Sequence, residues 1–249
     1  MKKIFLGLIL ISSLIACKKE TKSPSTNVSG TKTDTTNVVD QTTSGYGPNI
    51  SDTDGNTYKT VYIGKQRWMA ENLKTTKYSD GTVITNVTDA NQWTKLTTAA
   101  WSNYNNSDSL GIIYGKLYNW YSINPISNGN KNVCPTGWHV PNDAEWNILI
   151  DNLGGLEIAG SKMKEVGNNH WVNQNTDATN ISLFNALPAG VRGSSGFFET
   201  IAVSAYWWSS SNFSELKTYR FKTEKSSGNV YISIENKVAG FSIRCIEDN

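Results

Sequence analysis

The pattern of apolar and polar positions divides this 249-residue chain into three segments. Residues 4–14 form an apolar run directly after two lysines, and residues 18–48 are almost entirely polar. From about residue 50 onward, apolar residues recur at the spacings of strands and helices. We therefore expect a short targeting segment at 1–16, a linker at 17–48 and a folded domain at 49–249.

The first segment has the layout of a bacterial lipoprotein signal peptide. Its apolar run ends in Leu14-Ile15-Ala16-Cys17 and is too short to cross a bilayer, which takes about 20 apolar residues. We expect cleavage before Cys17, which then carries the lipid that holds the protein on the membrane. Because Lys18 stands where an aspartate would retain the protein at the inner membrane, we expect the outer membrane, on its periplasmic or its outer face. The alternative is an ordinary signal peptide with an incidental cysteine.

The second segment, residues 17–48, is dominated by Ser, Thr, Lys, Asn and Asp. Such a composition buries too little apolar surface to offset the chain entropy of folding. We therefore expect a disordered tether between the membrane and the domain.

The domain is expected to begin with a hairpin. Residues 58–63 and 66–70 alternate as strands do, and Asp54-Gly55 before them is a turn signal. Asp52, Asp54 and Asn56 also resemble part of a calcium loop. The glycine offset and the missing distal glutamate favour the turn.

The clearest helix begins at Asn142, where Glu145 can complete a capping box. Apolar residues then recur on one helical face until Gly154-Gly155 ends it. We expect further short helices over 115–121 and 156–166. Strands are expected over five later ranges: 182–187, 204–209, 218–223, 229–234 and 240–246.

The composition excludes one class of binding partner and favours another. Only 18% of residues are charged, the net charge is +2, and no basic stripe suited to a nucleic acid is present. Nine tryptophans and eleven tyrosines are typical of extracytoplasmic β-rich domains and of glycan binders. The alternative is that these rings build the core.

The number of cysteines is also consistent with an exported protein. If Cys17 carries lipid, Cys134 and Cys245 remain, and in an oxidising compartment they would form one disulfide. Two buried free thiols are the alternative. With two histidines and no metal-ligand spacing, we expect no metal site and no cofactor.

Several ordered motifs resemble one known family. They include Trp68-Met69-Ala70-Glu71-Asn72-Leu73, Tyr114-Gly115-x-Leu117-Tyr118-Asn119-Trp120, Cys134-Pro135-x-Gly137-Trp138-His139-Val140-Pro141, Tyr206-Trp207-Trp208-Ser209-Ser210 and Ser242-Ile243-Arg244-Cys245. From about residue 50 to the end, the chain resembles the Fibrobacter succinogenes major paralogous domain, a domain of unknown function abundant in lipoproteins of Bacteroidota and Fibrobacterota. The family supplies no catalytic residues.

The same motifs distantly resemble C-type-lectin-like folds, as in formylglycine-generating enzymes. The resemblance implies an α+β fold: twisted antiparallel sheets, two or three short helices, long loops and chain ends that lie close together. A disulfide between Cys134 and Cys245 would fit the bond that ties an early helix to the last strand in such folds. The lectin calcium motifs are absent, so calcium-mediated sugar binding is not supported.

No catalytic constellation stands out. There is no Gly-x-Ser-x-Gly elbow, Asp143 and Glu145 are explained as helix-start residues, and His139 is interpreted as a packed structural histidine. His170, in a polar stretch, is expected to be solvated. We therefore expect a non-catalytic binding or adhesion domain for a glycan or an envelope protein. An envelope hydrolase or modifying enzyme and a purely structural surface protein are the alternatives, and the oligomeric state is not indicated.

Four tryptophans are the candidate ligand contacts. Trp207 and Trp208 are adjacent in an expected strand and so face opposite sides; one enters the core and the other could stack on a sugar. The alternative is that loops cover both. Trp101 and Trp171 lie in loop-like stretches and are further candidates for exposure, as is Trp93.

Overall fold

The computed structural model describes residues 45–249. The predictions for the signal peptide, for Cys17 and for the tether up to residue 44 lie outside the described residues. The first strand, β1 (Gly45–Ser51), includes residues 45–48, which the sequence had assigned to the tether. Its antiparallel pairing with the next strand accounts for this difference.

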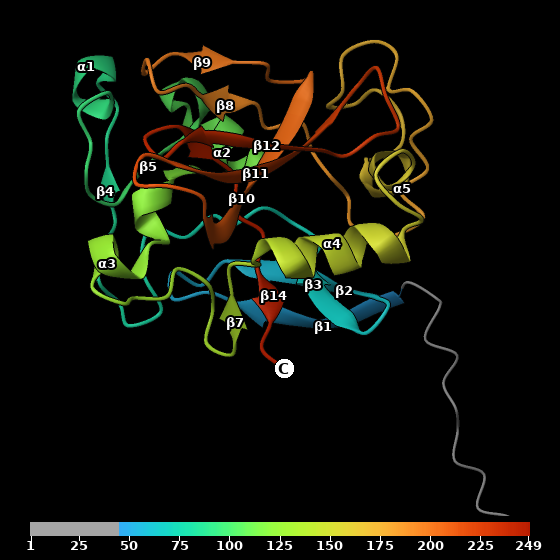
Figure 1. Ribbon diagram of the computed structural model, residues 1–249, viewed down its shortest axis with the longest axis horizontal. Helices are drawn as coiled ribbons and strands as arrows, with labels where there is room; N and C mark the ends of the chain where they lie inside the picture. Colours follow the sequence, from blue (N-terminus) through green and yellow to red (C-terminus); the bar gives the residue numbers. More distant parts are fainter. Residues whose placement is uncertain (1–44) are drawn as a thin grey trace, which may run out of the picture. The chain divides into compact units, whose positions relative to one another are not determined.

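The first and last strands of the described chain share a five-stranded sheet, here called the terminal sheet (Figure 1). Its order is β1, β2 (Thr57–Ile63), β3 (Gln66–Met69), β14 (Ile246–Glu247) and β7 (Trp138–His139). β2 and β3 pair antiparallel across Gly64-Lys65, which confirms the predicted hairpin. β14, from the end of the chain, lies between β3 and β7 and pairs with both.

A second sheet of three strands contains β10 (Ser204–Asn212), β11 (Lys217–Glu224) and β12 (Tyr231–Asn236). All its pairings are antiparallel. The strands predicted at 204–209 and 218–223 are confirmed. The strand predicted at 229–234 lies two residues later.

The third sheet has six short strands in the order β4 (Thr85–Asn86), β5 (Ala100–Ser102), β6 (Leu117–Asn119), β13 (Gly240–Phe241), β8 (Val191–Arg192) and β9 (Phe198–Glu199). β4 and β5 run parallel, and the other pairs are antiparallel. The predicted strand at 240–246 is thus divided between β13 in this sheet and β14 in the terminal sheet.

Two predictions of secondary structure are wrong. Residues 115–121 were expected to be helical, but 117–119 form β6, because their backbone pairs with β5 and β13; a 3₁₀ turn follows at Trp120–Ser122. Residues 182–187 form no strand. Leu183 and Asn185 have φ angles of 58° and 53°, which an extended strand does not allow.

The helices are α1 (Ala90–Trp93), α2 (Asp108–Tyr114), α3 (Pro125–Asn128), α4 (Asp143–Asn152) and α5 (Ala159–Met163). α4 has the predicted capping box between Asn142 and Glu145, and Gly154 follows its end with a φ of 95°. α5 is shorter than the predicted 156–166. The mixture of short helices and mainly antiparallel sheets makes this an α+β fold.

Helix α4 lies between the terminal sheet and the three-stranded sheet (Figure 1). Its Trp146 joins the two layers: the ring centroid is 4.8 Å from that of Trp68 below and 4.8 Å from that of Phe221 above. The predicted apolar face of the helix is thereby buried. Within residues 45–249, no helix combines the length and apolar character needed to cross a bilayer.

Candidate functional site

The four tryptophans predicted as ligand contacts are all buried. Trp207 and Trp208 are 0% exposed, Trp171 is 1% exposed and Trp101 is 8% exposed. Trp93 is also buried. The expectation that some of these rings form a sugar-stacking surface is therefore corrected.

The reason lies in the layering around β10. Trp207 and Trp208 do face opposite sides, as the strand period requires. On the α4 side, the ring centroid of Trp207 lies 5.8 Å from that of Trp146. On the other side, the ring centroid of Trp208 lies 4.4 Å from that of Phe241. Because both faces of β10 are covered, neither ring reaches solvent.

Trp101 and Trp171 belong to the interior despite their irregular surroundings. The indole of Trp101 donates to the Ile84 carbonyl at 3.0 Å, and that of Trp171 donates to the Ala186 carbonyl at 3.2 Å. Each ring thus anchors a neighbouring loop segment to the core.

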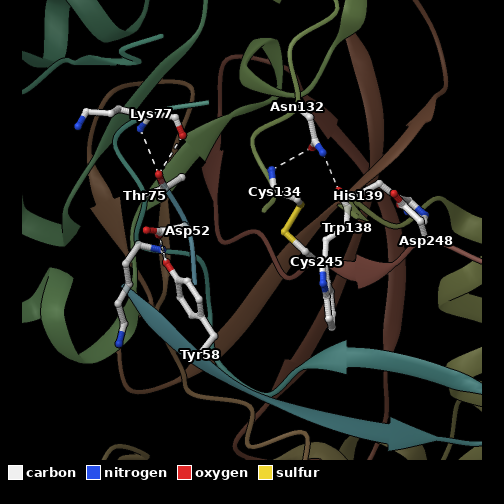
Figure 2. The surroundings of a disulfide bond; sticks show 11 residues. Asp52, Tyr58, Thr75, Lys77, Asn132, Cys134, Trp138, His139, Cys245 and Asp248 are labelled. Carbon is white, nitrogen blue, oxygen red and sulfur yellow. Dashed lines mark hydrogen bonds and ion pairs between the residues drawn. A yellow bond between two sulfur atoms is a disulfide. The ribbon is translucent and has the colours of Figure 1, made fainter. Parts of the chain in front are cut away.

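The two cysteines of the domain form a disulfide (Figure 2). Cys134 and Cys245 are 111 positions apart in the sequence, and both are buried. Asn132 orients the first cysteine: its side chain accepts from the Cys134 N–H at 2.9 Å and donates to the Trp138 carbonyl at 2.6 Å. The alternative of two free thiols is thereby excluded.

The aspartates near residue 52 form a turn rather than a cation site. Asp52 accepts hydrogen bonds from Asn56 and, at 2.5 Å, from the Tyr58 hydroxyl (Figure 2). Asp54 accepts from Thr76 and pairs with Lys77 at 3.0 Å. Burial acts to raise the pKa of Asp54, but the bonds from Thr76 and Lys77 outweigh it and lower the pKa to about 2. These carboxylates are saturated by protein donors.

His139 lies between two carboxylates. Its Nε2 is 2.8 Å from Glu145 Oε1 and its Nδ1 is 2.6 Å from Asp248 Oδ1. The hydrogen bond to Glu145, together with the one to Asp248, raises the pKa of His139 despite partial burial. Both ring nitrogens thus face carboxylates, and neither is paired with a serine or cysteine nucleophile of the described domain. It joins the start of α4 to the end of the chain.

His170, expected to be solvated, is paired. Its Nδ1 lies 2.9 Å from both Glu165 oxygens, and its ring packs edge-on against Tyr114. In the part of the chain that the structure describes, no group of three or more His, Cys, Asp or Glu side chains is placed to hold a metal ion.

One opening on the domain is a cleft of about 410 Å³, here called the lysine cleft. A larger opening, of about 610 Å³, lies elsewhere on the surface. Lys59, Glu71, Lys74 and Asn185 supply its polar walls, and Tyr46 from β1 stands at its edge. Tyr46 is 57% exposed, and the Lys59 ammonium lies 5.8 Å from the centroid of its ring. This ring therefore presents the aromatic surface that the tryptophans do not.

Hydrogen bonds hold the cleft in shape. Glu71 accepts from the Lys59 backbone N–H at 3.1 Å and pairs with the Lys74 ammonium at 3.3 Å. Next to Glu71, the side-chain amide oxygen of the buried Asn72 accepts from the Trp207 indole N–H at 3.0 Å and from Arg244 Nη2 at 2.9 Å. The polar floor is thus fixed to the core.

A smaller cavity of about 180 Å³ shares Lys74 with the cleft. It adds Lys116, Asp108 and Asn103 to the same surface. Burial lowers the pKa of Lys116, whose ammonium lies 4.2 Å from the ring centroid of Trp101. Three lysines against two carboxylates, Glu71 and Asp108, leave the joined cavities with one net positive charge.

Sequence reasoning missed these residues because they are far apart in the chain. Tyr46 fell within the predicted tether, and Asn185 fell within a strand that does not form. Glu71 and Asn72 did appear in one of the family motifs, which was the available signal.

Comparisons with known proteins agree with those motifs. No curated protein and no solved structure matches the chain. The model of the Fibrobacter succinogenes major domain matches residues 61–247, which include α4, the disulfide and most of the lysine cleft. The chain therefore belongs to the Fibrobacter succinogenes major domain family.

Proposed function

We propose that this protein is a lipid-anchored outer-membrane protein whose domain binds a glycan non-catalytically in the lysine cleft. The observation that carries the proposal is the exposed Tyr46 ring beside a cleft with both donors and acceptors. Ligand sites are typically concave, with a few polar groups converging on the ligand. Sugars suit this cleft, because their hydroxyls can donate to Glu71 and accept from the lysines.

The charge of the cleft narrows the ligand class. Lys59 and Lys74 line the cleft, and Lys116 lies in the adjoining cavity. A net positive surface attracts negatively charged partners over the range that salt screening allows. We therefore favour an acidic glycan over a neutral one.

The test is a glycan panel screened against the purified full chain. We expect binding to acidic glycans and a loss of about tenfold or more in each of two variants. Lys59→Ala removes a hydrogen bond from a charged group, and Tyr46→Ala removes the ring on which a sugar would stack. Lys95→Ala is the matched control, because Lys95 is exposed outside the cleft. Binding that is equal in all three variants, or no binding to any glycan, would count against the cleft.

The membrane anchor is tested separately. Cys17→Ala should move the protein from the membrane fraction to the soluble fraction, because it removes the lipid attachment site. Unchanged membrane retention would refute the anchor. The result does not depend on which ligand the domain binds.

We further propose that the α+β fold is C-type-lectin-like. Support comes from the shared sheet of the first and last described strands, and from the disulfide at the residue before β14. Cys134 lies in the loop before β7, not in a helix as the resemblance implied. An experimental structure that superposes on no such fold would refute this assignment.

An envelope hydrolase is the second candidate, and one observation favours it. Glu199 and Glu235 both line a separate cavity, and glycoside hydrolysis uses two facing carboxylates. Release of reducing sugar from an acidic polysaccharide, lost in Glu199→Gln, would support this candidate. An absence of release would leave the binding proposal. A purely structural surface role is less favoured, since the surface is hollowed in these two places.

A further inference from the structure

The cavity that holds Glu199 and Glu235 lies beside the three-stranded sheet, on the face that carries Tyr206. It has a volume of about 270 Å³ and is bordered by the turn that joins β8 to β9. Arg220 from the middle strand, β11, contributes its guanidinium to the wall. The β8–β9 turn contributes Ser195 at the opening.

Arg220 forms a loose ion pair with Glu235, but two of its guanidinium donors have no hydrogen bond in the described part of the chain. Its Nε and Nη1 atoms are shielded from solvent and have no hydrogen-bond partner among residues 45–249. The Glu235 carboxylate is 3.9 Å from Nε, which is too far for a hydrogen bond. Buried polar groups are hydrogen-bonded as a rule, and a charged donor without a partner is the costlier exception. A carboxylate bound against this guanidinium would accept hydrogen bonds from these two donors.

The guanidinium is held in place before any ligand arrives. Its central carbon lies 5.0 Å from the ring centroid of Tyr206 and 5.9 Å from that of Phe241. These two rings stack on each other, with a distance of 5.2 Å between their centroids and an interplanar angle of 11°. The Arg220 side chain is 18% exposed, and the cavity that it lines gives a ligand access to it. Such preorganisation reduces the entropy that binding costs.

The remaining cavity groups define the ligand. A carboxylate matches the planar guanidinium, whereas a bare sulfate would bring its charge close to Glu199 and Glu235 without offering them donors. Hydroxyl groups near that carboxylate would supply the donors. A volume just below the roughly 300 Å³ of ordinary ligand pockets suits one ring and excludes an extended chain.

We propose that this cavity binds a single hexuronate unit, free or at the end of a glycan. Its carboxylate pairs with Arg220, and its hydroxyls donate to Glu199 and Glu235. This site is lined by none of the residues of the lysine cleft and does not depend on the function proposed for that cleft.

The test is calorimetric titration of the purified full chain in detergent with galacturonate, galactose, alanine and sulfate. We expect galacturonate to bind about tenfold to a hundredfold more tightly than galactose, because only galacturonate gives Arg220 a charged acceptor. Arg220→Gln should remove this difference. Lys222→Gln is the matched control: it removes the same charge two residues along β11, outside the cavity, and should keep the difference.

A second variant keeps the proposal testable if Arg220→Gln does not fold. Ser195→Trp places a large ring at the exposed opening and leaves Arg220 intact, so it should weaken galacturonate binding at least about tenfold. Equal binding of galactose and galacturonate, or no binding of either, would overturn the proposal. Tighter binding of alanine or sulfate than of galacturonate would overturn the assignment to a sugar acid.

Discussion

Removal of the disulfide should cost this domain a large part of its stability. The double variant Cys134→Ala/Cys245→Ala opens a cross-link between residues 111 positions apart. For a loop of that length, the chain-entropy model gives about 4.8 kcal/mol at 25 °C. Because both sulfur atoms are buried, the small cavities left behind add a cost of the same sign. We therefore expect a loss of about 4–5 kcal/mol in the free energy of unfolding, the upper end of the range for removal of a native disulfide.

The position of the disulfide explains why other contacts cannot make up for its loss. β14 has two residues, and it pairs with β3 through Ile246 and with β7 through Ile246 and Glu247. Cys245 directly precedes β14, so the disulfide holds in place the strand that joins β3 to β7 in the terminal sheet. Without it, we expect the end of the chain to fray first.

Urea denaturation followed by tryptophan fluorescence measures this loss. With a slope of about 2–3 kcal/mol per molar urea, the midpoint should fall by roughly 1.3–2.5 M. Cys17→Ala is the matched control, because it removes a cysteine without opening the cross-link, and it should leave the midpoint unchanged. A loss below about 1 kcal/mol in the double variant would refute the chain-entropy reasoning for this fold.

Two further predictions concern buried and partly buried polar contacts. Asn72→Ala should lower the free energy of unfolding by more than about 3 kcal/mol, because it leaves the Trp207 indole N–H and Arg244 Nη2 without their acceptor. Asn152→Ala, exposed on α4, should cost less than about 0.5 kcal/mol in the same urea assay. Equal effects would contradict this role of Asn72. Because the pKa of His139 is raised in the folded state, its contribution to stability should be fully present below its unfolded pKa of about 6.5 and be lost as the pH rises through the folded pKa. The stability difference between the native protein and His139→Gln should therefore be larger at pH 6 than at pH 9 in thermal melts, and a constant difference would refute the carboxylate pairing.

The elements that sequence patterns predicted well are those set by local interactions. The hairpin of β2 and β3 follows from strand alternation around a two-residue turn, and α4 follows from its cap, its apolar spacing and the glycines after it. The family assignment rested on motifs of the same kind, each short and contiguous. These features require no knowledge of distant neighbours, so the chain's own periodicity was sufficient.

The failures came where distant partners decide the outcome. Residues 117–119 form a strand because β5 and β13 lie on either side, although their aromatic pattern also suited a helix. Trp208 alternates in facing with Trp207 as expected, yet it is buried because a second layer covers its side of β10. Local pattern determines which way a side chain points, but it does not determine what lies there.

The sequence by itself determined the hairpin, the capped helix and the family, since each depends on residues close together in the chain, and the α+β class was what the resemblance implied. It also limited the cysteine pairing to Cys134 with Cys245 or two free thiols, and the tertiary structure decided for the disulfide. Only the tertiary structure brought Tyr46, Lys59 and Asn185 to one cleft, and left Arg220 without a hydrogen-bond partner among the described residues. Clefts and donors without hydrogen bonds arise where separate layers pack together, and this packing depends on contacts between residues far apart in sequence.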